Sequence, residues 1–208
     1  MGRYLGPKCR LCRREGMKLF LKGERCYTEK CSFSRRKYIP GMHWKKRTKM
    51  SDYGIMLREK QKVKRMYGLL EKQFSNLFVK AAKKHGVTGE ILLQLLERRL
   101  DNVVYRLGWG TSRAHARQIV RHNHILLNGH KANIPSMIVN AGDRIEVKEK
   151  SRDNGIFKNI KDREKLREVP EWLTLDESGY VATVNRLPER SDITDKINEQ
   201  LIVEYYSK

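Results

Sequence analysis

Apolar residues recur at helical spacing from residue 52 to residue 107, and glycines divide this stretch into three helices. Ser51 is a typical N-cap for the first helix, which is expected to end at Gly68. The second helix is expected over 71–84, and the third over 90–107, where leucine and valine repeat on one face. Three consecutive amphipathic helices with short connections predict a small helical domain.

After residue 108 the pattern changes to shorter segments. Ser112 is expected to cap a helix, and a strand is expected over 124–127. The pair Asn128-Gly129 then predicts a tight hairpin, because both central positions of the favoured turn need a positive φ. A return strand is expected to reach about residue 134.

The remaining third of the chain predicts more strands. One is expected over 143–150, two more flank Ser178-Gly179, and another is expected over 199–207. Together these patterns predict an α+β fold, in which a small helical domain precedes an α-helix-plus-β-hairpin module that a small antiparallel sheet continues.

Positive charge is concentrated in the first residues. The chain of 208 residues carries 45 Lys+Arg against 24 Asp+Glu, a formal net charge of +21. Residues 1–50 hold 16 Lys+Arg against 3 Asp+Glu, whereas residues 151–208 hold 10 against 12. A basic surface of this kind favours a polyanionic partner, whose neutralised phosphates release counterions.

All four cysteines lie in this basic stretch, as Cys9, Cys12, Cys26 and Cys31. No apolar run is long enough for a membrane span and no secretory signal is visible, so a cytoplasmic protein with reduced thiols is expected. The spacing C-x2-C-x13-C-x4-C is typical of one structural zinc ion held by four thiolates. An iron–sulfur cluster and four ordinary buried thiols are the alternatives. A zinc ion would stabilise a segment too polar to form its own core.

Residues 32–51 are interpreted as an extended basic arm in which aromatic residues alternate with basic clusters. This mixture suits RNA, whose unpaired bases stack on aromatic rings while phosphates contact Arg and Lys. A flexible charged linker is the alternative. In the first helix Arg58, Lys62 and Arg65 form a stripe of the kind that is usually a solvated face. We expect most of the positive charges here to lack acidic partners, which favours a phosphate contact.

The segment SRAHARQIVRHNHILLNGHKAN, followed by AGDRIEV, resembles the RNA-binding module of the small-subunit ribosomal protein number four family, bacterial type. The N-terminal GRYLGPKCRLCRREGMKLFLKGERC resembles the zinc-bearing start of that family. SDYGIMLREKQKVKRMYG, RLDNVVYRLG and NEQLIVEYYSK resemble it too, so the similarity covers nearly the whole chain.

The resemblance implies a structural constituent of the small ribosomal subunit in the cytoplasm. It implies a primary binder of small-subunit rRNA that recognises a multi-helix junction, nucleates assembly, lies near the mRNA entrance and affects translational accuracy. Neighbouring small-subunit ribosomal proteins are the other implied partners. No membrane and no small-molecule substrate are expected. The alternatives are an accessory RNA-binding subunit of an RNA-modifying or aminoacylating enzyme and a zinc-finger DNA regulator, but no catalytic signature is visible.

Charge, spacing and the resemblance together nominate the functional residues. The zinc ligands are Cys9, Cys12, Cys26 and Cys31. The RNA contacts are Arg3, Arg10, Arg13, Arg14, Lys22, Arg25, Arg35, Arg36, Lys45, Lys46, Arg47, Tyr53, Arg58, Lys62, Arg65, Ser112, Arg113, Arg117, Gln118, Arg121, His122, Asn128 and Lys131. We expect four segments: a basic arm with the zinc site (1–50), a helical rRNA-binding domain (51–97), the RNA-binding module with its sheet (98–190) and a C-terminal segment that packs back on the preceding domains (191–208).

Overall fold

A computed structural model describes residues 2–45, 49–155, 157 and 168–207. The chain forms two compact units, one of residues 1–92 with 195–208 and one of residues 93–194. The helices are α1 (Lys8–Glu15), η1 (Gly23–Cys26), α2 (Ser32–Arg35), α3 (Asp52–Met66), α4 (Glu71–Ala82), α5 (Thr88–Glu97), α6 (Leu100–Arg106), α7 (Arg113–Arg121), α8 (Glu149–Arg152) and α10 (Glu199–Ser207). The strands are β1 (Ile125–Leu127), β2 (His130–Lys131), β3 (Arg144–Val147), β4 (Leu173–Leu175) and β5 (Val181–Val184).

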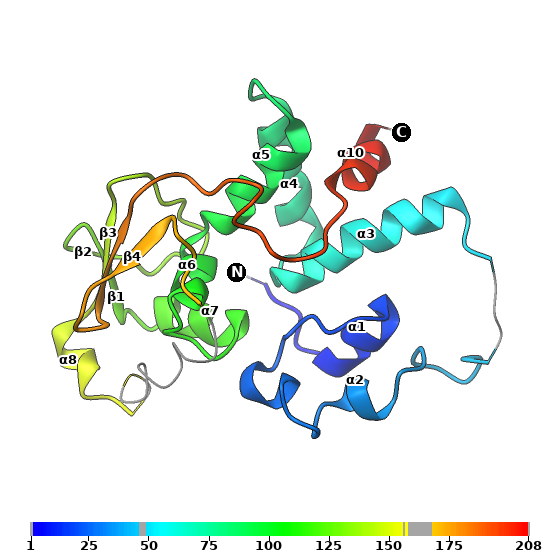
Figure 1. Cartoon of the computed structure of the whole chain (residues 1–208), viewed down its shortest axis with the longest axis horizontal. Helices are drawn as coiled ribbons and strands as arrows, with labels where there is room; N and C mark the ends of the chain where they lie inside the picture. Colours follow the sequence, from blue (N-terminus) through cyan, green and yellow to red (C-terminus); the bar gives the residue numbers. More distant parts are fainter. Residues whose placement is uncertain (1, 46–48, 156, 158–167, 208) are drawn as a thin grey trace. The chain divides into compact units, whose positions relative to one another are not determined.

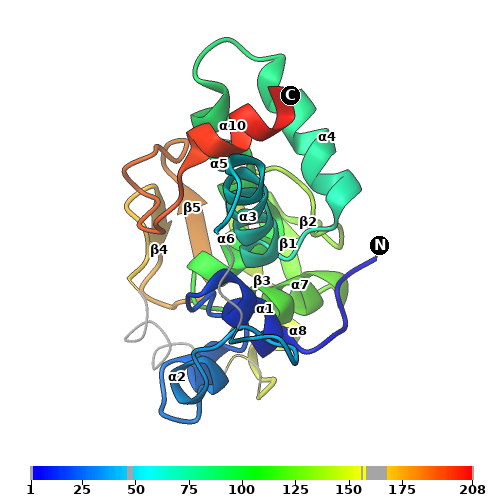
Figure 2. The same cartoon turned by 90° about the vertical axis from the view of Figure 1, so that its right-hand side faces the viewer.

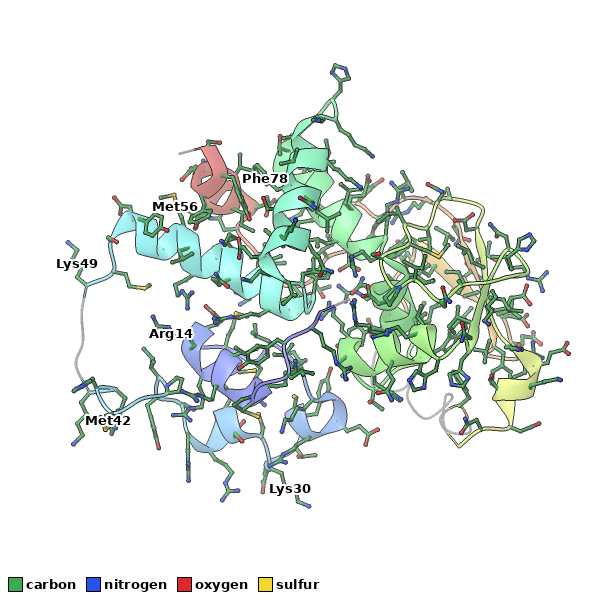
Figure 3. The ribbon with its side chains drawn as sticks, turned by 180° about the vertical axis from the view of Figure 1, so that it is seen from behind. Arg14, Lys30, Met42, Lys49, Met56 and Phe78 are labelled. Carbon is green, nitrogen blue, oxygen red and sulfur yellow. The ribbon has the colours of Figure 1, made fainter. Side chains whose placement is uncertain are left out.

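The first unit is built around α3 and α10 (Figures 1 and 2). Ser51 caps α3 by accepting a hydrogen bond from the backbone of Gly54, as its position predicts. Phe74 of α4 is completely buried, and its ring stacks with that of Tyr206 in α10 at a centroid distance of 6.3 Å. In Figure 3 Phe78 of α4 and Met56 of α3 lie beside α10. The α10 helix therefore completes the core of this unit.

The prediction of a strand over 199–207 is wrong, because this segment forms the helix α10. The apolar residues of this segment fit both the helical and the strand periodicity. Ile202 is fully buried, and Tyr206 lies four residues later on the same helical face. Contact with α3 and α4 therefore selects the helix.

The second unit is an antiparallel five-stranded sheet, in the order β2-β1-β3-β5-β4, with α6 and α7 packed together (Figure 1). Its core includes the fully buried Trp109, and Trp172 is 1% exposed. The predicted hairpin is confirmed: Asn128 and Gly129 have φ values of 51° and 77°, and they join β1 to β2. The two strands expected around residues 178–179 are confirmed as β4 and β5.

Three predicted elements differ in extent. The helix expected over 90–107 breaks after α5, because Leu100 N–H donates to Met137 and Val139 N–H donates to Arg98. These backbone bonds replace the helical ones and leave Arg99 extended, with ψ of 134°. The return strand covers only His130–Lys131, and the strand expected over 143–150 ends at Val147 before α8 begins.

Candidate nucleic-acid interface

The four cysteines lie in or beside short helices of the N-terminal arm, residues 1–50. The helix α1 carries Cys9 and Cys12, Cys26 ends η1, and Cys31 precedes α2. Three of them are 7% exposed, whereas Cys9 is half-buried. All four are free thiols. Among the described residues of the arm, Leu19, at 1% exposure, is the large apolar side chain that accompanies them inside.

The electrostatics of the thiols show that they interact. Burial raises the pKa of Cys12, and the neighbouring Cys26, Cys9 and Cys31 raise it further. Burial likewise raises the pKa of Cys26, although the backbone N–H of Lys22 donates to its sulfur over 3.4 Å. Burial also opposes ionisation of Cys31, but hydrogen bonds from the backbone of Ser34 and Phe33 outweigh it and lower its pKa. The thiols thus share one environment with backbone donors.

Within the described part of the chain, no three His, Cys, Asp or Glu side chains stand close enough together to hold a metal ion. The donors fit structural zinc in chemistry, because they are four unpaired, mostly buried sulfurs. Their side chains do not form a closed ligand set as they stand.

Most nominated cations of the arm face solvent. Arg13 differs, because its Nε donates to the carbonyl of Tyr38 over 2.9 Å and its guanidinium lies 4.7 Å from the Tyr38 ring centroid. Lys46 and Arg47 lie outside the described residues. The exposed cations that were nominated in the described part of the arm are Arg3, Arg10, Arg14, Lys22, Arg25, Arg35, Arg36 and Lys45.

The expectation that the stripe on α3 lacks acidic partners is wrong. Arg58 and Arg65 both pair with Glu15 of α1, whose side chain is 2% exposed. Lys62 pairs with Glu59 at 2.5 Å and donates to the carbonyl of Lys196 over 2.9 Å. These side chains therefore attach the arm and the 195–208 segment to α3.

The nominated Tyr53, near the start of α3, is 56% exposed. Its hydroxyl lies 3.4 Å from that of Tyr205, so one of its edges faces α10. The Tyr53 ring can therefore stack on an RNA base only on its solvent side.

On α7 the three arginines spaced four residues apart have different environments. Arg113 donates from Nε to Asn102 over 2.8 Å and lies over the Tyr105 ring at 4.6 Å. Arg117 is 6% exposed and pairs with Asp101 at 3.0 Å. Arg121 is exposed. The buried Ser112 is the helix cap and accepts from the backbone of His115. Only part of the predicted arginine face is therefore presented to solvent.

A buried charge network behind α7 was not predicted. Asp101 accepts two hydrogen bonds from Arg99, of 3.0 and 2.8 Å, besides its pair with Arg117. Glu97, 1% exposed, accepts from Arg106 over 2.9 and 2.7 Å. The sequence signal was the repeated charge in ERRLDNVVYR within an otherwise apolar run. This network fixes α6 against α7.

The hairpin beside α7 carries the remaining nominated residues. The side chain of Asn128 accepts from the backbone N–H of Arg144 over 2.8 Å and donates to Asp143 over 2.9 Å, so it holds the turn to β3. Gln118, His122 and Lys131 are exposed. Arg121 is exposed as well, so nominated polar side chains reach solvent both at α7 and in β2.

Comparison with known families divides the chain into two matched regions. Residues 3–97 match the ribosomal protein S4/S9 N-terminal domain, and residues 98–145 match the S4 domain. The chain is 59%, 60% and 61% identical to the small ribosomal subunit protein uS4 of Trichlorobacter lovleyi, Geobacter sulfurreducens and Geobacter metallireducens. Each alignment covers the whole of both chains. The chain therefore belongs to the uS4 family of ribosomal proteins, as its resemblance predicted.

Proposed function

We propose that this chain is a structural RNA-binding component of the small ribosomal subunit in the cytoplasm. The observation that carries this is the exposed cationic surface on both family-matched regions, on the arm and on the α7–hairpin surface. Such a surface recognises phosphates and shape rather than sequence. No helix among the described residues is both long and apolar enough to cross a membrane.

The family is one of structural ribosomal proteins, so the expectation that the chain is not an enzyme is confirmed. The alternative of an accessory subunit of an RNA-modifying or aminoacylating enzyme is therefore rejected. The finer role that we propose is recognition of a multi-helix junction in small-subunit rRNA, with nucleation of assembly. Each of the two units carries exposed cations, which suits a junction where several RNA helices present phosphates. Contacts with neighbouring ribosomal proteins, proximity to the mRNA entrance and an influence on accuracy belong to the same proposal.

We test this role by measuring affinity against salt for small-subunit rRNA and for duplex DNA of equal charge. Tight, saturable binding to the RNA alone supports the proposal, whereas equal binding to both contradicts it. Arg121→Ala with Lys131→Ala should lower the slope of log affinity against log salt by about 1.4 to 1.8, since each phosphate contact contributes about 0.7 to 0.9. Lys148→Ala with Lys150→Ala removes the same charge from exposed residues outside the nominated set and should change the slope less.

We also propose that Cys9, Cys12, Cys26 and Cys31 hold one structural zinc ion. The support is four unpaired thiols in one environment with backbone N–H donors to three of the sulfurs. Bound zinc would link α1, η1 and α2 and supply folding energy to the arm.

Metal analysis of the purified chain tests this site. One zinc per chain, lost in Cys12→Ser while the circular dichroism of the helices persists, supports it. Iron with visible absorbance would indicate the cluster instead, and a metal-free chain with an ordered arm would contradict any metal site.

A further inference from the structure

A pocket of about 310 Å³ lies between α1 and α2 in the arm. Its wall includes four arginines, together with Ser32 and Cys9, and the arginines are Arg10, Arg13, Arg35 and Arg36. The volume is at the lower end of the range for small-ligand sites, about 300–1,000 Å³. No carboxylate and no aromatic ring belongs to this wall.

The four guanidinium groups have no neutralising partner among the described residues. No ion pair within the described ranges involves any of them. The nearest acidic residue in α1, Glu15, is already paired with Arg58 and Arg65 of α3. Four like charges around one cavity repel one another, and they exceed the formal −2 of a tetrathiolate zinc site that includes Cys9 of the same wall, so an anion inside the pocket would stabilise them.

One of these arginines is already oriented. Arg13 donates from Nε to the carbonyl of Tyr38, and its guanidinium carbon lies 4.7 Å from the centre of the Tyr38 ring, which packs at a tilt against Trp44 with 4.6 Å between centroids. This leaves the other N–H donors of Arg13 for a ligand and reduces the entropy lost on binding. Arginine forks match phosphate oxygens in a bidentate manner.

We propose that this pocket is a preformed binding site for one backbone phosphate of the bound RNA, with its ribose. The inference rests on the proposed function and specifies it. A phosphate is favoured over a nucleobase, because the wall offers four cationic guanidinium groups and no aromatic ring. A concave site is reached by a phosphate that protrudes, so we expect the contacted nucleotide at a bend of the strand rather than within a regular helix.

The test combines phosphate neutralisation with arginine substitution in the full chain. Methylphosphonates placed one at a time along the rRNA fragment identify phosphates whose charge matters to the wild-type protein. We expect one such position to weaken wild-type binding about tenfold or more, because the lost hydrogen bonds are made to a charged group. Arg10→Gln with Arg35→Gln should bind more weakly and become insensitive to neutralisation at that position, while other positions keep their effects.

Lys30→Gln with Lys37→Gln is the matched control, because it removes two exposed charges of the same arm that lie outside the pocket wall. Figure 3 shows Lys30 at the periphery of the arm. In this variant, each methylphosphonate position should weaken binding as much as it does in the wild type; we call this set of effects the sensitivity map. Arg10→Lys with Arg35→Lys keeps the charge but loses the forks, and we expect it to lose part of the sensitivity.

Identical sensitivity maps for the arginine and lysine double variants would overturn the pocket while leaving the RNA-binding function intact. A wild-type chain that fails to bind the RNA would instead overturn the proposed function itself. Because Arg10 and Arg35 are exposed, circular dichroism and thermal unfolding of each variant should match the wild type.

Discussion

Asp101→Asn is the substitution for which the structure predicts a large loss of stability. The Asp101 carboxylate, 7% exposed, accepts from two arginines that are themselves 4% and 7% exposed. An amide of the same shape keeps one accepting oxygen, so two buried cations lose their counter-charge. Breaking a buried ion pair by removing one partner costs about 3–5 kcal/mol, which is a large share of a total stability of about 5–15 kcal/mol.

Urea unfolding followed by circular dichroism measures this cost in the full chain. The second unit should unfold at a lower urea concentration, and Asp153→Asn, at an exposed position of the same unit, should change the free energy of unfolding by less than about 0.5 kcal/mol. A double variant with Arg117→Met should recover part of the loss, because one buried cation is removed with the anion. An Asp101→Asn cost below about 1 kcal/mol would refute the reasoning, since it would mean that water reaches this network.

Three further predictions concern the turn, a histidine and the C-terminal helix. Asn128→Ala should cost about 1–2 kcal/mol in urea unfolding, because it loses two side-chain hydrogen bonds and leaves alanine at positive φ, whereas Asn128→Gly should cost less. Burial lowers the pKa of His124, so as the pH decreases this histidine takes up a proton in the unfolded chain at a higher pH than in the folded chain. The free energy of unfolding should therefore fall as the pH decreases through the unfolded pKa of about 6.5. Thermal unfolding of His124→Gln across this pH range should not show that fall. A variant with the same pH dependence as the wild type would contradict the prediction. Tyr206→Ala should cost about 1–3 kcal/mol, because its partly buried ring lies 4.3 Å from that of Phe78 between centroids, and it should expose α10 to proteolysis. A protease-resistant variant would show that α10 does not depend on this ring.

Local signals in the sequence predicted the parts of the fold that depend on few residues. The Ser51 and Ser112 caps and the Asn128-Gly129 turn follow from the conformation or hydrogen bond of a single residue, and all three are observed. The break at Arg99 and the helix at 199–207 depend on partners far along the chain, in the 137–139 loop and in α3. No local pattern contains that information.

The candidate interface was predictable by composition but not residue by residue. Basic residue types at helical spacing marked the arm and α7, yet the sequence could not distinguish Arg121 in solvent from Arg117 beside Asp101. Likewise Arg58 and Arg65 share the partner Glu15, which lies 43 and 50 residues earlier in the chain. Charge counts show how many cations exist, whereas three-dimensional pairing decides which of them remain available to RNA.

The return of residues 195–208 to the first unit also has a consequence during protein synthesis. Asn198 N–H donates to Glu59 across 139 positions of the chain, so α3 is made long before its partner segment. At about 5–20 residues per second, α3 waits roughly 7–30 s for that segment. Until then the side chains that α10 will cover, Phe74 among them, lack part of their cover, while residues 93–194 are all available to fold. During synthesis, the second unit (93–194) is therefore expected to complete its fold before the first unit, which needs residues 195–208.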